Sequence, residues 1–145
     1  MLTLAAIRTI GARAYSAAQV DAWAARHPAA ERFLACAAKG DRILVAVDAQ
    51  DMPMAYVLTE ADGHVDMLYC HPDHSGNGVA GLLLHAAEAE ARSKGIARLY
   101  TEASELARPV FARAGYTLLH RRDFKLPDER GDVAIHNYAM EKRLA

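Results

Sequence analysis

Two glycines separated by one residue lie at the centre of a run, residues 68–84, that reads LYCHPDHSGNGVAGLLL. The run passes from an apolar strand end through a proline-marked loop and a glycine turn into a leucine-rich helix. Gly76 and Gly78 carry no Cβ atom, so main-chain N–H groups around them can converge on one ligand. The helix directs its unpaired N–H groups and its positive dipole end at the same place. Together these features predict a phosphate-binding site.

The spacing of these glycines differs from the common nucleotide motifs. The P-loop requires a Lys after its last glycine, and no Lys follows Gly78. The letters of the dinucleotide fingerprint are present at Gly76, Gly78 and Gly81, but in that motif the strand runs directly into the first glycine. Here residues 71–75 intervene, and no βαβ unit precedes them. A tight strand-to-helix turn without a ligand is the alternative at this point.

A carboxylate inside an apolar strand is a second candidate for chemistry. Asp66 precedes Cys70 by four residues, and period-two counting places it on the same face as Leu68 and Cys70. A carboxylate there is costly unless it is paired or used. Its alternatives are catalysis and local pairing. His136 shares a strand face with Tyr138 and could also act as a base, although a lone strand histidine is often only half-exposed.

Two further groups are weaker candidates. His71 and His74 are three residues apart in a loop, but no third ligand is evident, so we expect no metal site. Cys70 has His71 beside it, yet adjacent strand residues point to opposite faces, which disfavours a thiolate nucleophile. We expect Cys70 to be a small buried residue near the ligand.

The composition limits the class of protein. The chain has 145 residues, 52% of them hydrophobic, and a formal net charge of −1. This length suits a single domain over residues 1–145 with a substantial core. The absence of a basic cluster argues against nucleic acid as a partner. We find no membrane-spanning run and no signal-peptide pattern, and two cysteines without motif spacing favour a cytoplasmic location.

The order of expected elements predicts an α/β (α+β) domain. Helices are expected over residues 1–14, about 17–27 and about 29–39, the second beginning at the capping-box pair Ser16 and Gln19. Strands are expected over 42–47, 53–61 and 64–70, with a hairpin turn at Asp62-Gly63. A helix over about 78–94, a strand over 98–102, a helix over 105–114 and strands over 116–126 and 132–143 follow. A mixed, mostly antiparallel sheet flanked by helices accounts for this order.

The glycine run resembles the coenzyme A loop of the GNAT N-acetyltransferase superfamily, x-Pro-x-x-Arg/Gln-Gly-x-Gly-x-Gly/Ala followed by a leucine-rich helix. Pro72, Gly76, Gly78 and Ala80 fall on this pattern. Ser75 departs from it, because the family usually has Arg or Gln there.

The resemblance extends over nearly the whole chain. Residues 103–116 resemble the second GNAT signature, with Ser104 at its Asn position and Phe111 at its Tyr position, and residues 137–142 resemble a common last strand. The family normally opens with a strand before its first helix. This chain begins within that helix, so we expect the first strand to be absent or replaced from elsewhere.

The resemblance implies a site for acetyl-CoA as cosubstrate. The third and fourth strands would splay apart, and the pantetheine arm would bond the main chain of Leu68, Tyr69 and Cys70. Ser104 would touch that arm from the other side. The pyrophosphate would lie on the residues of the glycine turn, which are Ser75, Gly76, Asn77, Gly78, Val79 and Ala80.

The resemblance also implies catalytic roles. Phe111 cannot supply the proton that the family's Tyr often gives to the leaving thiolate, so Tyr138, Tyr69 and Ser104 are the candidates, with water as a further option. Asp66 is the first candidate for the base and His136 the second. Acetyl transfer to an amine needs this base, a polarised carbonyl and a proton for the thiolate.

Two functions remain open at the level of sequence. One is acetyl-CoA-dependent N-acetylation of a primary amine on a small molecule or peptide, by direct transfer in a ternary complex. The other is a non-catalytic domain that binds acyl-CoA. Tyr15, Trp23 and Phe33 could line the acceptor pocket or pack in the core. A homodimer is possible, because an incomplete sheet edge favours association.

Overall fold

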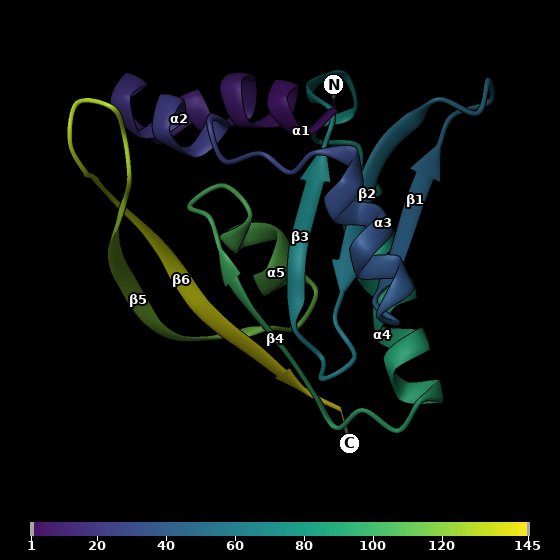
Figure 1. Cartoon of the computed structure of the whole chain (residues 1–145). Helices are drawn as coiled ribbons and strands as arrows, with labels where there is room; N and C mark the ends of the chain where they lie inside the picture. The colour runs from purple at the N-terminus through teal and green to yellow at the C-terminus, as the bar shows by residue number, and fades with distance from the viewer. Residues whose placement is uncertain (1, 145) are drawn as a thin grey trace.

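The structure is a computed structural model that describes residues 2–144 (Figure 1). The chain begins with a helical segment formed by α1 (Leu2–Ala5), the π-helical η1 (Ala6–Ile10) and the 3₁₀ turn η2 (Gly11–Arg13). Helices α2 (Ala17–Ala24) and α3 (Ala30–Ala38) follow. The expected capping box is confirmed at α2, because the Ser16 hydroxyl accepts from Gln19 N and the Gln19 side chain accepts from Ser16 N.

The first sheet contains β1 (Arg42–Val47), β2 (Pro53–Thr59) and β3 (Val65–Cys70), in that order and all antiparallel. Alternate residues of β2 enter two cores. Tyr56 and Leu58 pack with Cys36 of α3, whereas Ala55 and Val57 pack with residues of α4 (Val79–Ser93). Helices therefore cover both faces of this sheet, which explains why β2 is almost wholly apolar.

The second sheet has the order β4-β6-β5, with β4 (Arg98–Ala103), β6 (Val133–Arg143) and β5 (Thr117–Leu126) antiparallel to their neighbours. Helix α5 (Arg108–Arg113) begins at Arg108 and not at Glu105 as expected. Residues 105–107 form a turn instead, because Glu105 N donates to Tyr15 Oη and Ala107 N donates to Ser104 Oγ.

Within the described residues, the one backbone bridge between the two sheets lies near the start of β3, and from there β3 and β4 diverge toward the N-terminal helices (Figure 1). An isolated parallel bridge joins His64 to Tyr100, and Thr101 Oγ1 donates to Val65 O at 2.9 Å. Gly63 makes this contact possible. Its φ is +101°, and a Cβ on it would lie 2.2 Å from the carbonyl oxygen of Arg98.

These observations confirm the expected fold class, a mixed, mostly antiparallel α/β arrangement flanked by helices. Within residues 2–144, no strand precedes β1. The prediction that Asp66 shares a face with Leu68 and Cys70 was wrong, because Asp66 bonds Arg32 of α3 whereas Leu68 and Cys70 pack in the core that contains α4. The β2–β3 register pairs Leu58 with Met67 and Thr59 with Val65, so Asp66 is an extra residue in a bulge, where period-two counting fails.

Candidate active site

A cleft of about 800 Å³ fills the space between the diverging strands β3 and β4. Its walls come from distant parts of the chain, namely the N-terminal helical segment, β3, the glycine turn, the end of β4, α5, and the middles of β5 and β6. Of the cofactor-binding residues expected from sequence, all but one line this cleft: Leu68, Tyr69, Cys70, Ser75, Gly76, Gly78, Val79, Ala80 and Ser104. Asn77 is the exception and is not among the lining residues.

The glycine turn presents main-chain donors at one end of the cleft. Gly76 and Gly78 have φ values of +83° and +78°, which side-chain-bearing residues rarely adopt. Gly78 is the N-cap of α4, and no side chain caps this helix N-terminus. The first turn of α4 also contains no acidic residue. The N–H groups and dipole of α4 are thus available to an anion in the cleft.

The edge of β3 that faces the cleft is free beyond its contact with β4. Leu68, Tyr69 and Cys70 pair with β2 on one side only. Their cleft-facing main-chain groups can therefore bond an extended ligand lying beside the strand. Burial raises the pKa of the Cys70 thiol, which keeps it neutral and agrees with a packing role.

Phe111 and Ser104 lie on the opposite wall. Phe111 is only 2% exposed and packs edge-on against Tyr116, with ring centroids 5.0 Å apart. Ser104 Oγ accepts from Ala107 N at 3.1 Å, so its hydroxyl hydrogen can be directed to another acceptor. No hydroxyl stands at the position where the resemblance implied a Tyr.

A hydrogen-bonded cluster that the sequence analysis missed is centred on Glu105. His136 Nε2 lies 2.6 Å from Glu105 Oε2, and Tyr138 Oη donates to the same oxygen at 2.8 Å. Tyr15 Oη accepts from Glu105 N at 2.8 Å and donates to His136 O at 3.0 Å. The Arg108 guanidinium lies over the Tyr138 ring at 4.4 Å. Glu105 and His136 thus form a dyad that Tyr138 and Tyr15 hold in place.

The electrostatics of this dyad define its proton positions. Hydrogen bonds from His136 and then from Tyr138 lower the pKa of the Glu105 carboxyl, so it is ionised at neutral pH. An ionised carboxylate only accepts, so neutral His136 must carry its proton on Nε2. Nδ1 is then the basic nitrogen, and His136 lines the cleft.

Tyr138 is brought to the dyad and not to the cleft surface. It is 8% exposed, is not among the lining residues, and gives its hydroxyl proton to Glu105. The arrangement makes Tyr138 a support for Glu105. Of the three candidate proton donors, Ser104 and Tyr69 line the cleft. Tyr69 Oη accepts from Trp23 Nε1 at 3.2 Å.

Asp66 also lines the cleft, at its closed end, but its carboxylate is paired. Arg32 of α3 donates to Asp66 Oδ2 at 2.9 Å, and the Asp66 side chain is 24% exposed. Local pairing, the alternative to catalysis, is therefore present. This does not test the base role, which stays a prediction.

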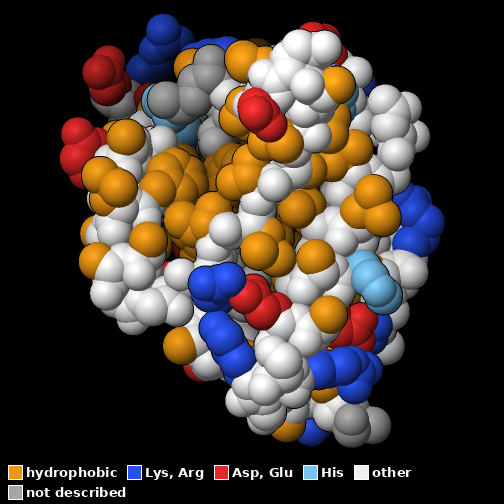
Figure 2. Space-filling model, turned by 90° about the vertical axis from the view of Figure 1, so that its right-hand side faces the viewer, with side chains coloured by type: hydrophobic (Ala, Val, Ile, Leu, Met, Phe, Trp, Pro, Cys, Tyr) orange, Lys and Arg blue, Asp and Glu red, His pale blue; other side chains and the backbone are white. Residues whose placement is uncertain are grey.

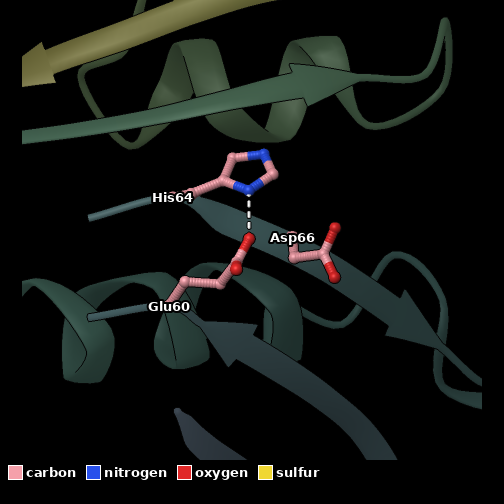
Figure 3. Close-up of side chains that lie close together, drawn as sticks. All are labelled: Glu60, His64 and Asp66. Carbon is pink, nitrogen blue, oxygen red and sulfur yellow. Dashed lines mark hydrogen bonds and ion pairs between the residues drawn. The ribbon is translucent and has the colours of Figure 1, made fainter. Parts of the chain in front are cut away.

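Beside Asp66 lies a group of charged side chains at the start of β3 (Figure 3). His64 Nδ1 lies 2.5 Å from Glu60 Oε1, and His64 Nε2 lies 2.8 Å from Glu102 Oε1 on β4. The hydrogen bond to Glu102 chiefly raises the His64 pKa to about 9, against the effect of burial. A protonated His64 between two carboxylates thus ties the first sheet to the second.

Glu60, His64 and Asp66 bring potential metal-ligand atoms within 4.8 Å of one another. Both ring nitrogens of His64 are engaged, Asp66 is bonded to Arg32, and Lys39 Nζ lies 3.6 Å from Glu60. A cation would have to displace a proton and compete with two cationic side chains. We therefore interpret Glu60, His64 and Asp66 as part of an ion-pair cluster and not as a metal site.

The residues considered for an acceptor pocket separate into two sets. Tyr15 and Trp23 line the cleft, whereas Phe33 packs edge-on against Tyr56 in the core. A second hollow of about 290 Å³ lies between α2 and the β5–β6 pair. His136 and Phe124 line both spaces, so His136 can be approached from either side.

Comparison with known proteins agrees with this geometry. The acetyltransferase (GNAT) domain profile matches residues 11–126. A GCN5-related N-acetyltransferase from Rhodopseudomonas palustris is 32% identical over 97% of this chain and 84% of its own, with a TM-score of 0.82. The chain belongs to the GNAT acetyltransferase family.

More distant GNAT structures share the fold. The PaiA N-acetyltransferase from Thermoplasma acidophilum, solved with coenzyme A, is 16% identical over 99% of this chain and 89% of its own, with a TM-score of 0.76. A phosphinothricin acetyltransferase from Sinorhizobium meliloti, solved with acetyl-CoA, is 18% identical over 80% and 68%, with a TM-score of 0.67. No protein of curated function matches the sequence significantly.

The GNAT fold of this chain contains no helix, among residues 2–144, that is both long and apolar enough to span a bilayer.

Proposed function

We propose that this GNAT protein is an acetyl-CoA-dependent N-acetyltransferase that transfers acetyl directly to a primary amine of a small molecule or peptide. One observation carries the proposal. At one part of its wall, a single cleft has an uncapped helix N-terminus behind two positive-φ glycines. At another part it has His136, which is bonded to Glu105. The first suits a diphosphate, and the second suits removal of a proton from an amine.

The donor would lie along β3. Its pyrophosphate would accept from the main chain of the turn at Gly76–Val79, and its pantetheine arm would bond the free edge at Leu68–Cys70. A main-chain N–H of that edge would polarise the thioester carbonyl. The Ser75 N–H is donated to Pro72 O at 3.2 Å, so Ser75 would contribute its hydroxyl in place of the longer donor common in the family.

The acceptor would be activated by His136. In our proposal Nδ1 takes a proton from the amine, and Glu105 fixes the ring and stabilises the imidazolium that forms. The amine nitrogen then forms a bond to the carbonyl carbon and the C–S bond breaks. Because Phe111 has no acidic proton and Tyr138 is engaged with Glu105, the thiolate takes its proton from Ser104 or from water. Asp66 is the alternative base, since it too lines the cleft.

Release of free coenzyme A tests this function. Incubation with acetyl-CoA and a panel of small amines and short peptides should produce thiol at a rate that depends on the amine, with the acetylated amine detected by mass. Tight acetyl-CoA binding without thiol release over a broad panel would favour the non-catalytic alternative, for which the missing hydroxyl at Phe111 is the supporting observation. Absence of binding would contradict both.

A further inference from the structure

The outer edge of β1 is open. Within residues 2–144, β1 pairs with β2 on one side and with nothing on the other. The register shift in this pair skips Met54 of β2, so β1 itself is regular over Arg42–Val47. Its interior, Ile43–Val47, contains no Pro or Lys. A regular, uncharged edge with unpaired N–H and C=O groups lacks the usual protection against pairing with another strand.

Exposed apolar side chains gather beside this edge. We define the β1 edge patch as Val45 and Val47 of β1, Leu34 of α3 and Met52 of the β1–β2 turn. Their exposures are 49%, 45%, 72% and 61%. Figure 2 views the molecule from the side of β1 and shows hydrophobic side chains spread over a broad part of this surface. Large exposed apolar areas of this kind mark interaction surfaces.

We propose that the β1 edge binds the β1 edge of a second copy of this chain, as two antiparallel strands related by a two-fold axis. In an antiparallel pair, two directly opposed residues both turn their main-chain N–H and C=O groups toward the partner strand, or both turn them away from it. These two orientations alternate along a strand. A two-fold axis that relates two copies of β1 must therefore pass through a residue position, and not between two positions. The axis can therefore lie at Leu44, Val45 or Ala46, and at no point between them.

Charge selects one of these registers. With the axis at Val45, Arg42 lies opposite Asp48 of the second copy, and the same pair recurs at the other end. Ile43 then lies opposite Val47 of the second copy, on the face of the β1 edge patch. With the axis at Leu44, Arg42 would lie opposite Ala46 of the second copy. With the axis at Ala46, it would lie opposite Gln50. In both registers the pairing of opposite charges is lost. Opposite charges and apolar pairs facing each other across strands stabilise a sheet.

The local environment allows this pairing. Arg42 is 54% exposed at its side chain and bonds Glu90 of α4 at 2.6 Å, so the guanidinium lies on the α4 face and keeps free donors. Asp48 Oδ1 accepts from Gln50 N and Met52 N, which holds the carboxylate at the end of β1. The cleft lies at β3, on the other side of β2, so the proposal does not depend on acetyl transfer.

Sedimentation or light scattering across the micromolar range tests the proposal, with circular dichroism to confirm folding. The wild-type protein should dimerise with concentration. Val45→Asp should be monomeric, because it places two carboxylates at the two-fold axis. Leu119→Asp changes a residue of similar exposure, 47%, on β5, an edge strand of the second sheet, and should leave the dimer unchanged. A monomeric wild type, or a dimer lost in Leu119→Asp but not in Val45→Asp, overturns the proposal and leaves the edge to another occupant.

A charge exchange tests the register. Arg42→Glu and Asp48→Lys should each weaken dimerisation about tenfold, because each creates like charges at both ends. An equimolar mixture of the two variants should dimerise nearly as well as the wild type, since the new carboxylate meets the new ammonium at one end and Arg42 meets Asp48 at the other. A mixture no tighter than the separate variants refutes this register.

Discussion

The Glu105 carboxylate bonds two groups, His136 Nε2 and Tyr138 Oη. The carboxylate holds His136 Nε2–H, and the main chain of Glu105 and of His136 is held by the Tyr15 hydroxyl. Such an arrangement fixes the tautomer of an imidazole before any substrate arrives. In the proposed mechanism, the reactivity of His136 Nδ1 depends on Glu105, which need not touch substrate.

The first prediction compares the two candidate bases. His136→Gln should lower kcat by about 10²-fold or more, because general base catalysis typically contributes 10²–10⁴. Glu105→Gln should lower kcat less and leave KM nearly unchanged, since it removes the orientation of the ring and not the base. The losses should be largest at a pH where the wild-type imidazole is neutral and should shrink at low pH, because an imidazolium cannot take a proton from the amine. The measurement is the pH profile of kcat and KM for a good acceptor.

Asp66→Asn is the matched comparison. If His136 is the base, Asp66→Asn should retain most of the wild-type kcat and the same pH profile. A loss in Asp66→Asn that exceeds the loss in His136→Gln would assign the base to Asp66.

Sequence could not identify this dyad. Glu105 lies 31 residues before His136 and 33 before Tyr138 along the chain, so no local spacing joins them. His136 itself was found through strand alternation, which holds along the regular strand β6. Alternation failed at Asp66 because a bulge in β3 adds one residue, and bulges leave no reliable mark in a single sequence.

At the scale of elements, the glycine turn was predictable because its chemistry is local. Gly76, Gly78 and α4 follow one another in the chain, so the phosphate site needs no tertiary information. The turn at residues 105–107 was not predictable in the same way. It replaces the first turn of the expected helix because Glu105 N bonds Tyr15, which comes from the N-terminal segment.

The second prediction concerns the contact between the sheets at Gly63. Gly63→Ala should destabilise the fold by about 2–4 kcal/mol, because it adds left-handed strain to a clash with the Arg98 carbonyl oxygen. Chemical denaturation measures this loss. Gly131→Ala is the control, since Gly131 has a φ of +112° but a Cβ there meets nothing within 4 Å. Equal losses in the two variants would contradict the close approach of the sheets at Gly63.

At the scale of the whole molecule, the function depends on two sheets that touch at one end and separate at the other. The element order in the sequence predicted a mixed sheet, and the resemblance predicted its opening near Cys70. Neither the element order nor the resemblance indicated which side chains hold the two sheets together at the end where they touch. There, a charged His64 lies between Glu60 of the β2–β3 turn and Glu102 of β4, and its ring stacks on Tyr100 at 4.8 Å.

The third prediction is a pH dependence of stability. The His64 pKa is raised from 6.5 to about 9, so its stabilising effect is fully present below pH 6.5 and is lost as the pH rises through 9. The loss should be on the order of 3–4 kcal/mol, because the rise from 6.5 to about 9 corresponds to about 1.4 kcal/mol for each pKa unit. The free energy of unfolding of the wild type, minus that of His64→Gln, should fall over this range. A difference that is constant from pH 6 to 9.5 would contradict a charged His64 between the sheets.

We propose above all that the uncapped N-terminus of α4 holds the pyrophosphate of coenzyme A, and calorimetric titration with coenzyme A tests this most directly. Gly78→Glu places a carboxylate where the phosphates would lie and should abolish measurable binding. Gly40→Glu is the matched control, because Gly40 has a φ of +100° in equally open space at the C-terminal end of α3, away from the cleft. We predict wild-type affinity for Gly40→Glu and none for Gly78→Glu, whereas equal affinity in both variants would contradict the claim.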